Sequence, residues 1–171
     1  MNVQLRQIES PAVISVGSNL GDRTATFAAA VRALAEADGI EVTAISTPIE
    51  TVAIRPDGED PAAPAYLNAV VLIRTTLAPR ALLAVLNGIE HDNGRVRAEP
   101  WGDRTLDLDI VDYAGMQSSA VDLTLPHPRA FERSFVLRPW LEVDPEAVLP
   151  GHGRVADLVA ALGSPGSRSG S

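Results

Sequence analysis

The order of apolar segments along the chain constrains the fold more than any other feature of the sequence. Short runs rich in β-branched residues predict strands, and longer segments with apolar residues at helical spacing predict helices. Each of the first two predicted helices separates a pair of strands, whereas the two middle strands follow one another directly. Such long crossovers with one direct return suit an α+β fold, a ferredoxin-like βαββαβ antiparallel sheet with helices. The predicted strands are 12–16, 41–50, 66–76 and 104–113, and the predicted helices are 22–38 and 78–92.

The segments outside this pattern are predicted to be loops and additional helices. Residues 53–65 combine several prolines with Gly58 and three acidic residues, which predicts a loop, and 94–103 is predicted as a second loop. Beyond the last strand we expect a short polar connection and then two C-terminal helices, 130–142 and 154–162.

The length of the chain, 171 residues, suits one domain with a buried core. We expect that domain to span 12–162, after an N-terminal extension over 1–11. The Gly, Ser and Pro content of 163–171 predicts a disordered tail. No apolar run approaches the roughly 18 residues needed to span a bilayer, and the N-terminus does not resemble a secretory signal. We therefore expect a cytoplasmic protein without a membrane partner.

The sequence contains neither cysteine nor lysine, so all fourteen basic residues are arginines. The absence of cysteine excludes disulfides, thiol nucleophiles and Cys-ligated metals. The absence of lysine excludes a P-loop of the usual kind and Schiff-base chemistry. Any anionic ligand must therefore be held by arginine, by backbone N–H groups or by a metal ion.

The distribution of charge indicates a small anionic ligand. The net charge of −8 disfavours nucleic acid as a partner. Six arginines nevertheless lie close together in the sequence, which indicates local binding of an anion. They are Arg95, Arg97, Arg104, Arg129, Arg133 and Arg138.

Two aspartates in the last predicted strand form a candidate metal site. Side chains alternate along a strand, so Leu106, Leu108 and Ile110 share one face, and Asp107 and Asp109 share the other. Two adjacent carboxylates repel each other, and strands disfavour aspartate. A divalent cation offsets that cost, and Mg²⁺ is commonly held by one or two carboxylates together with substrate phosphates. The alternative is a solvated strand face that carries two acids by chance.

Basic residues on both sides of these aspartates favour a phosphate ligand. Arg95, Arg97 and Arg104 precede the pair, and Arg133 follows it. Guanidinium groups bind phosphate oxygens in a bidentate manner; the alternative is that these arginines form surface ion pairs. His127, between two prolines, either donates to a phosphate or is a structural loop histidine.

Five stretches of the sequence resemble the 6-hydroxymethyl-7,8-dihydropterin pyrophosphokinase family of folate synthesis. The resemblance extends from about residue 12 to residue 162, with the motifs in the family's order. The stretches are Val16-Gly-Ser-Asn-Leu-Gly-Asp-Arg23, Tyr66-Leu-Asn-Ala69, Gly94-Arg-Val-Arg97, Trp101-Gly-Asp-Arg-Thr-Leu-Asp-Leu-Asp-Ile110 and Leu125-Pro-His-Pro-Arg129.

This resemblance implies transfer of pyrophosphate from ATP to the hydroxymethyl group of the pterin, with AMP leaving. It implies that Asp107 and Asp109 hold two Mg²⁺ ions and act in catalysis together with Arg95 and Arg104. The predicted loops 53–65 and 94–103 match the family's mobile lids. The implied nucleotide and phosphate contacts are Glu90, Arg95, Arg97, Arg104, Ile110, Thr124, His127 and Arg133. The implied pterin contacts are Thr51, Ile54, Tyr66, Asn68, Trp101 and Phe135, with Tyr66 and Phe135 on either side of the ring and Asn68 at its edge.

Two other functions stay open at the level of the sequence. The first loop is longer than is usual in the family, which is compatible with a weakly catalytic relative that binds pterin or nucleotide as a regulatory module. Another Mg²⁺-dependent phosphotransferase on the same kind of sheet is the second alternative. In each case we expect a monomer that binds small molecules.

Overall fold

A computed structural model of the chain describes residues 8–18, 23–51, 53–55, 58–60, 66–92 and 106–162. The side chains of residues 23, 53–55 and 58–60 are outside this description. Most of the predicted N-terminal extension, the predicted tail 163–171 and the predicted loop 94–103 also lie outside the described residues.

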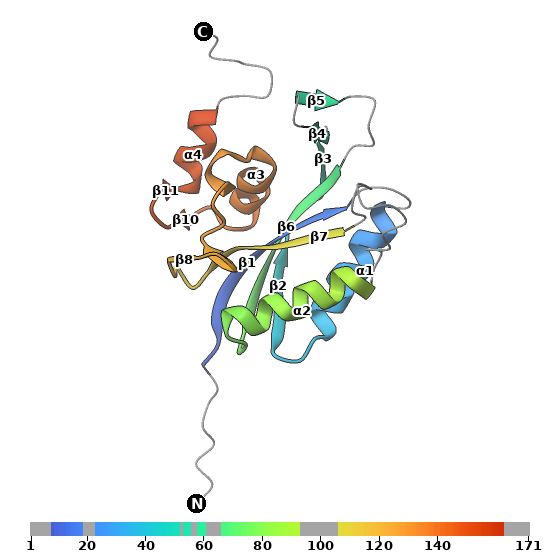
Figure 1. Cartoon of the computed structure of the whole chain (residues 1–171). Coiled ribbons are helices and arrows are strands. Elements are labelled where there is room, and N and C mark those ends of the chain that lie inside the picture. Colours follow the sequence, from blue (N-terminus) through green and yellow to red (C-terminus); the bar gives the residue numbers. More distant parts are fainter. Residues whose placement is uncertain are drawn as a thin grey trace, which may run out of the picture.

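An antiparallel sheet of five strands forms the centre of the molecule (Figure 1). Strand β1 (Ser10–Ser18) lies between β6 (Tyr66–Thr75) and β7 (Leu106–Tyr113). On its other edge β6 pairs with β2 (Ile40–Ile45) and then with β3 (Ile49–Thr51). The order β2-β6-β1-β7 places strands that are distant in the sequence side by side, as the two predicted crossovers require.

Four helices cover the two faces of the sheet, two on each face (Figure 1). Helices α1 (Arg23–Glu36) and α2 (Pro79–Asp92) pack on one face, and α3 (Ser134–Val143) and α4 (Val155–Leu162) lie on the other. Because side chains alternate along a strand, the central strand β1 serves both layers. Its Ile14 and Val16 belong to the core with α1 and α2, and its Val13 belongs to the core with α3.

The structure confirms both predicted helices of the first layer to within two residues at each end. Pro79 opens α2, where its missing N–H group costs no helical hydrogen bond. Leu82, Leu86 and Ile89 form the buried stripe of this helix, as their spacing predicts. None of the helices in the described chain is long and apolar enough to cross a membrane.

The prediction of one continuous strand over 41–50 is wrong, because the chain leaves the sheet between β2 and β3. Residues 46–48 belong to neither strand. Ser46 stays attached to β6 through its backbone N–H, which donates to Val70 O at 2.9 Å, and through its Oγ, which accepts from Val70 N–H at 2.8 Å. Both carboxylate oxygens of Glu142 on α3 accept from Thr47 N–H, at 3.1 and 3.2 Å. These side-chain contacts interrupt the strand, and they cannot be read from its apolar pattern.

Short hairpins occupy segments that were predicted as loops or connections. Within 53–65, β4 (Ala53–Arg55) pairs with β5 (Gly58–Asp60). The connection after β7 contains β8 (Ser118–Ala120) paired with β9 (Leu123–Leu125). A third pair, β10 (Val148–Leu149) with β11 (Gly153–Arg154), precedes α4. Strands of two or three residues are too short for a period of two to identify them.

The predicted helix 130–142 is divided in two at Arg133. The first part is a single 3₁₀ turn, η1 (Ala130–Glu132), and the second is α3. Arg133 between them is extended, with φ −103° and ψ 98°. The periodicity of apolar residues continues across this break, so the sequence alone predicts one helix.

Candidate active site

A cavity of about 580 Å³ opens on the sheet face that carries α3, next to the C-terminal end of β1. It lies where β1, β6 and β7 meet η1 and the start of α3. The strands, η1 and α3 therefore bring together side chains that are far apart in the sequence. The lining residues are Ser15, Gly17, Thr51, Tyr66, Asn68, Asp107, Asp109, Arg129, Glu132, Arg133, Ser134 and Phe135.

Asp107 and Asp109 share one wall of this cavity, as the strand pattern predicts. Both are half-buried, whereas Leu106 and Leu108 on the opposite face are buried in the core. Their partners on β1 are small, because Asp107 pairs with Gly17 and Asp109 with Ser15. Space is therefore left in front of the carboxylates. The oxygen donors that β7 presents to the cavity are this pair of carboxylates.

This donor set fits Mg²⁺ better than the metals that select nitrogen or sulfur. Mg²⁺ takes oxygen ligands and keeps several waters or phosphate oxygens, so it needs only one or two carboxylates from the protein. An open cavity in front of Asp107 and Asp109 leaves room for those additional ligands.

His127 lies close to this carboxylate pair. Its backbone N–H donates to Val111 O on β7 at 2.9 Å, and its Nδ1 accepts from Arg129 N–H at 3.2 Å. Burial lowers the pKa of His127; the carboxylate of Asp109 acts in the opposite direction, and the guanidinium groups of Arg133 and Arg129 lower it further. Since Nδ1 accepts, the neutral ring carries its proton on Nε2 and can donate it to an anion.

Four of the predicted pterin contacts meet in the cavity. Thr51, Tyr66, Asn68 and Phe135 all line it. Asn68 is only 5% exposed, and its Nδ2 donates to Thr51 Oγ1 at 2.5 Å. Gly17 lies opposite Asn68 in the strand register, and a Cβ at Gly17 would come within 3.0 Å of Asn68 Oδ1. The amide of Asn68 therefore has a defined orientation beside a position that only glycine leaves open.

Phe135 and Arg133 form the wall that faces these strands. The guanidinium carbon of Arg133 lies 5.6 Å from the centroid of the Phe135 ring, which is a cation–π distance. Arg133 thus connects an aromatic wall with the charged end of the cavity.

Three predicted nucleotide contacts lie elsewhere in the structure. Glu90 is buried, and its Oε2 accepts from Leu108 N–H at 2.9 Å, so this carboxylate joins α2 to β7. Ile110 is buried in the core with α1 and α2. Thr124, together with His127, lines a second cavity of about 390 Å³ between the β8–β9 hairpin and the residues after β10.

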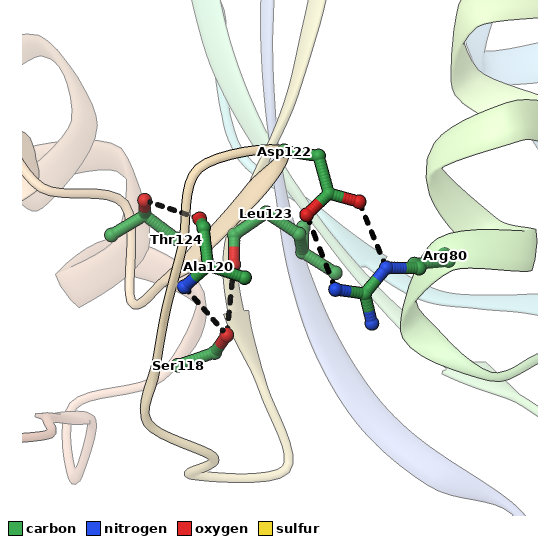
Figure 2. A network of polar contacts seen from close by, with 6 residues as sticks. All are labelled: Arg80, Ser118, Ala120, Asp122, Leu123 and Thr124. Carbon is green, nitrogen blue, oxygen red and sulfur yellow. Dashed lines mark hydrogen bonds and ion pairs between the residues drawn. The ribbon is translucent and has the colours of Figure 1, made fainter.

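Polar contacts hold the β8–β9 hairpin to the start of α2 (Figure 2). Arg80 Nε lies 2.8 Å from Asp122 Oδ2, and Arg80 Nη2 lies 3.2 Å from Asp122 Oδ1. This hydrogen bonding lowers the pKa of Asp122. Within the hairpin, Ser118 Oγ donates to Leu123 O at 2.9 Å, and Thr124 Oγ1 donates to Ala120 O at 3.1 Å. The hairpin leads directly into His127 and the segment 126–133.

Several predicted site residues lie outside the described part of the chain, and their roles stay predictions. They are Arg95, Arg97, Trp101 and Arg104, together with the side chain of Ile54 on β4.

The structure adds site residues that sequence reasoning missed. Ser15 and Gly17 line the cavity because they lie on β1 opposite the aspartates; the alternation of β1 contained this signal, but the pairing with β7 did not follow from it. Arg129, Glu132 and Ser134 line the cavity because η1 turns there. Arg129 belongs to the arginine cluster that the sequence predicts to bind an anion.

Comparison with known proteins gives concordant results. A family model for 7,8-dihydro-6-hydroxymethylpterin-pyrophosphokinase matches residues 13–145. A 2-amino-4-hydroxy-6-hydroxymethyldihydropteridine pyrophosphokinase from Methylorubrum extorquens is 42% identical over 151 residues, 88% of this chain and 92% of the relative. The enzyme of the same name from Bacillus subtilis is 40% identical over 132 residues, 77% of each chain.

A solved structure has the same fold. The crystal structure of a Plasmodium falciparum HPPK-DHPS triple mutant superposes with a TM-score of 0.71 at 13% identity. The match covers 92% of this chain and 45% of the Plasmodium chain. At this identity the likeness concerns the fold alone, an α+β architecture with an antiparallel sheet and four helices.

Proposed function

The chain belongs to the 7,8-dihydro-6-hydroxymethylpterin-pyrophosphokinase family, the diphosphokinases of folate biosynthesis, and on this premise we propose how its cavity performs the reaction. Asp107 and Asp109 hold the Mg²⁺ of the ATP complex, and the Thr51–Asn68 side holds the pterin. The observation that carries this proposal is that both aspartates, Asn68 and Phe135 line one cavity.

The reaction joins the pterin hydroxymethyl oxygen to the β-phosphorus of ATP. The bond between the β-phosphorus and the oxygen that bridges it to the α-phosphorus breaks, AMP leaves with that oxygen, and the hydroxyl proton is released. Such a transfer depends mainly on in-line positioning and on neutralisation of phosphate charge. Bound Mg²⁺ supplies that neutralisation and orients the phosphates.

The protein's own side chains supply orientation and further positive charge. Tyr66 and Phe135 bind the faces of the flat pterin ring, and Asn68 Oδ1 accepts a hydrogen bond from its edge. Arg133 and the Nε2–H group of His127 bind phosphate oxygens. The half-buried position of these groups strengthens their electrostatic contribution relative to bulk water.

The remaining assignments from the resemblance are part of the same proposal. Arg95 and Arg104 act in catalysis, and Arg97, Glu90, Ile110 and Thr124 contribute to a nucleotide site that extends beyond the cavity. Ile54 and Trp101 complete the pterin site. We also propose a single domain over 12–162 that acts as a cytoplasmic monomer, and we class its sheet as ferredoxin-like on the strand order β2-β6-β1-β7.

Substitution of either aspartate tests the metal assignment. D107A and D109A should each reduce AMP formation from ATP and the pterin by at least about a hundredfold, because charge stabilisation at the transferred phosphates is lost. The matched control is D157A, since Asp157 is exposed on α4 and outside the cavity; it should turn over like the wild type. Turnover near the wild-type value in D107A, with folding intact, would refute the metal role.

A calorimetric titration separates this proposal from its two alternatives. The wild-type chain is titrated with the pterin in the presence of Mg²⁺ and a non-hydrolysable ATP analogue. Pterin binding is expected in this titration, together with AMP formation when ATP replaces the analogue. Pterin binding without turnover would identify a binding module, and binding of the analogue alone would identify a different phosphotransferase.

A further inference from the structure

Arg129 and Glu132 stand at the edge of the active-site cavity as an ion pair with no assigned role. Both residues line the cavity that also contains Asp107 and Asp109. Arg129 Nε lies 2.8 Å from Glu132 Oε1, and the two side chains are 67% and 45% exposed. The guanidinium group of Arg129, beside the proposed triphosphate site, is thus paired with the carboxylate of Glu132.

Hydrogen bonds fix the backbone on both sides of this pair. Arg129 N–H donates to His127 Nδ1 at 3.2 Å, and Arg133 N–H donates to Ala130 O at 3.1 Å. Between Arg129 and Glu132, the ring of Phe131 stacks on His152, with the centroids 4.6 Å apart and the planes 5° from parallel. The turn η1 therefore sets the position of both backbones, and any change of partner involves the side chains alone.

The ion pair itself is weak enough to exchange. Exposed pairs of this kind contribute little to stability, because water screens them and two long side chains lose rotamer freedom. In the described part of the chain, Glu132 contacts Arg129 only through Nε. The Nη groups of the same guanidinium are then available for phosphate oxygens, which match its planar fork.

We propose that Arg129 is a further phosphate-binding residue of the active site and that Glu132 competes with the nucleotide for it. Without ATP, Glu132 holds the guanidinium; when the triphosphate enters, Arg129 binds a phosphate oxygen and Glu132 is released into water. This inference rests on the proposed function, because it requires a triphosphate in the cavity.

The two members of the pair should respond in opposite directions. Removal of the Arg129 charge takes away an attraction for the triphosphate. Removal of the Glu132 charge takes away both a competitor for Arg129 and a negative charge next to the ligand. If the pair only stabilised η1, loss of either partner would break the same contact and weaken binding to the same degree.

This difference can be tested by calorimetry, in which the Mg²⁺ complex of a non-hydrolysable ATP analogue is titrated into R129Q, into E132Q and into the wild type. R129Q should weaken the Kd by at least about threefold, a modest factor for one exposed charged contact. E132Q should bind the analogue more tightly than the wild type. The control is R154Q, which breaks an exposed pair of the same kind between Arg154 Nη2 and Glu146 Oε2 at 3.1 Å, outside the cavity; its Kd should not change.

The dependence of the Kd on salt concentration gives a second test, because a purely structural role of Arg129 would not make the effect of R129Q depend on salt. The difference between R129Q and the wild type should shrink as the ionic strength rises, because screening removes the contribution of an exposed charge. A Kd for R129Q within about threefold of the wild type, or a Kd for E132Q that is not below that of the wild type, overturns the proposal. Absence of analogue binding by the wild type would instead refute the proposed function itself.

Discussion

Three aspartates on β7 show how the surroundings of a residue decide its role. Asp107 and Asp109 face the cavity, whereas Asp112 lies beyond a shift in register between Val13 and Ile14 of β1. At that shift Val111 becomes the additional residue on β7 and joins the core with α3. Asp112 Oδ1 is left buried without a hydrogen-bond partner among the described residues.

Burial raises the pKa of Asp112 above its ordinary value, against the opposing effect of the neighbouring backbone N–H groups of Gly115 and Tyr113. A raised pKa in the folded state means that the folded chain holds this proton more tightly than the unfolded chain does. The ionised carboxylate therefore destabilises the fold. This cost is absent at pH values well below the ordinary pKa of a carboxyl group, develops as the pH rises towards the folded-state pKa, and is constant above it.

The first prediction concerns D112N, which remains uncharged at every pH. As the pH rises from about 4 to about 7, the free energy of unfolding of D112N should increase relative to that of the wild type, and the difference should then level off. Urea denaturation at several pH values measures it. Asp122 is the control, because Arg80 lowers its pKa and its ionised form therefore stabilises the fold; the D122N difference should not move in favour of D122N as the pH rises. A flat difference for D112N would contradict the assignment.

At the scale of elements, two glycines show that the same residue has different roles in and after a helix. Gly88 lies within α2, is exposed, and has no atom within 4 Å of the position of an added Cβ. Gly39 follows α1 with φ +82°, and an added Cβ would lie 2.9 Å from Thr76 Oγ1. Gly39 O also accepts hydrogen bonds from Thr76 N–H and Thr75 Oγ1, so this turn joins α1 and β2 to the end of β6.

The second prediction is that substitution by alanine changes stability in opposite directions at these two positions. G88A should raise the free energy of unfolding by about 0.5–1 kcal/mol, because alanine loses less backbone entropy in a helix. G39A should lower it by about 2 kcal/mol, because a left-handed conformation disfavours a Cβ and the turn is crowded. Denaturant titration of both variants measures the two free energies of unfolding. Changes of the same sign and size in G88A and G39A would contradict the structure.

At the scale of the whole molecule, one sheet joins two hydrophobic layers. Leu86 on α2 is fully buried in the layer with α1, and Leu149 on β10 is fully buried in the layer with α3. The active-site cavity lies on the second layer's side, since Phe135 and Arg133 come from α3 and the residue before it. Because β1 contributes to both layers, neither layer keeps a complete core without the other.

The third prediction is that both layers unfold in a single transition. L86A and L149A should each lower the free energy of unfolding by about 2–5 kcal/mol, the usual cost of a cavity at a fully buried leucine, with little change in the denaturant m value. Far-ultraviolet circular dichroism and tryptophan fluorescence should give coincident curves. L162A, at a leucine that is 39% exposed, is the control and should cost much less. Separate transitions in L149A would show that the second layer unfolds on its own.

The sequence by itself determined the class of fold, the long elements and the family. Apolar periodicity is a local property, so α1, α2, β6 and the alternation of β7 follow from neighbouring residues alone. The placement of Asp107 and Asp109 on one face is a consequence of the same alternation. Family motifs are also contiguous, and the comparisons confirm the family that they indicated.

Tertiary structure decided which distant residues meet and where elements break. Gly17 faces Asn68 because of the register between β1 and β6. Glu90 accepts a hydrogen bond from the backbone of Leu108 because α2 packs on β7. Phe131 stacks on His152 because the β10–β11 hairpin returns to η1. The breaks after β2 and at Arg133 depend on hydrogen bonds and backbone angles that no hydrophobic pattern contains. Arg129 and Glu132 line the cavity with Asp107 and Asp109 for the same reason, because contacts between distant segments arise only when the chain packs.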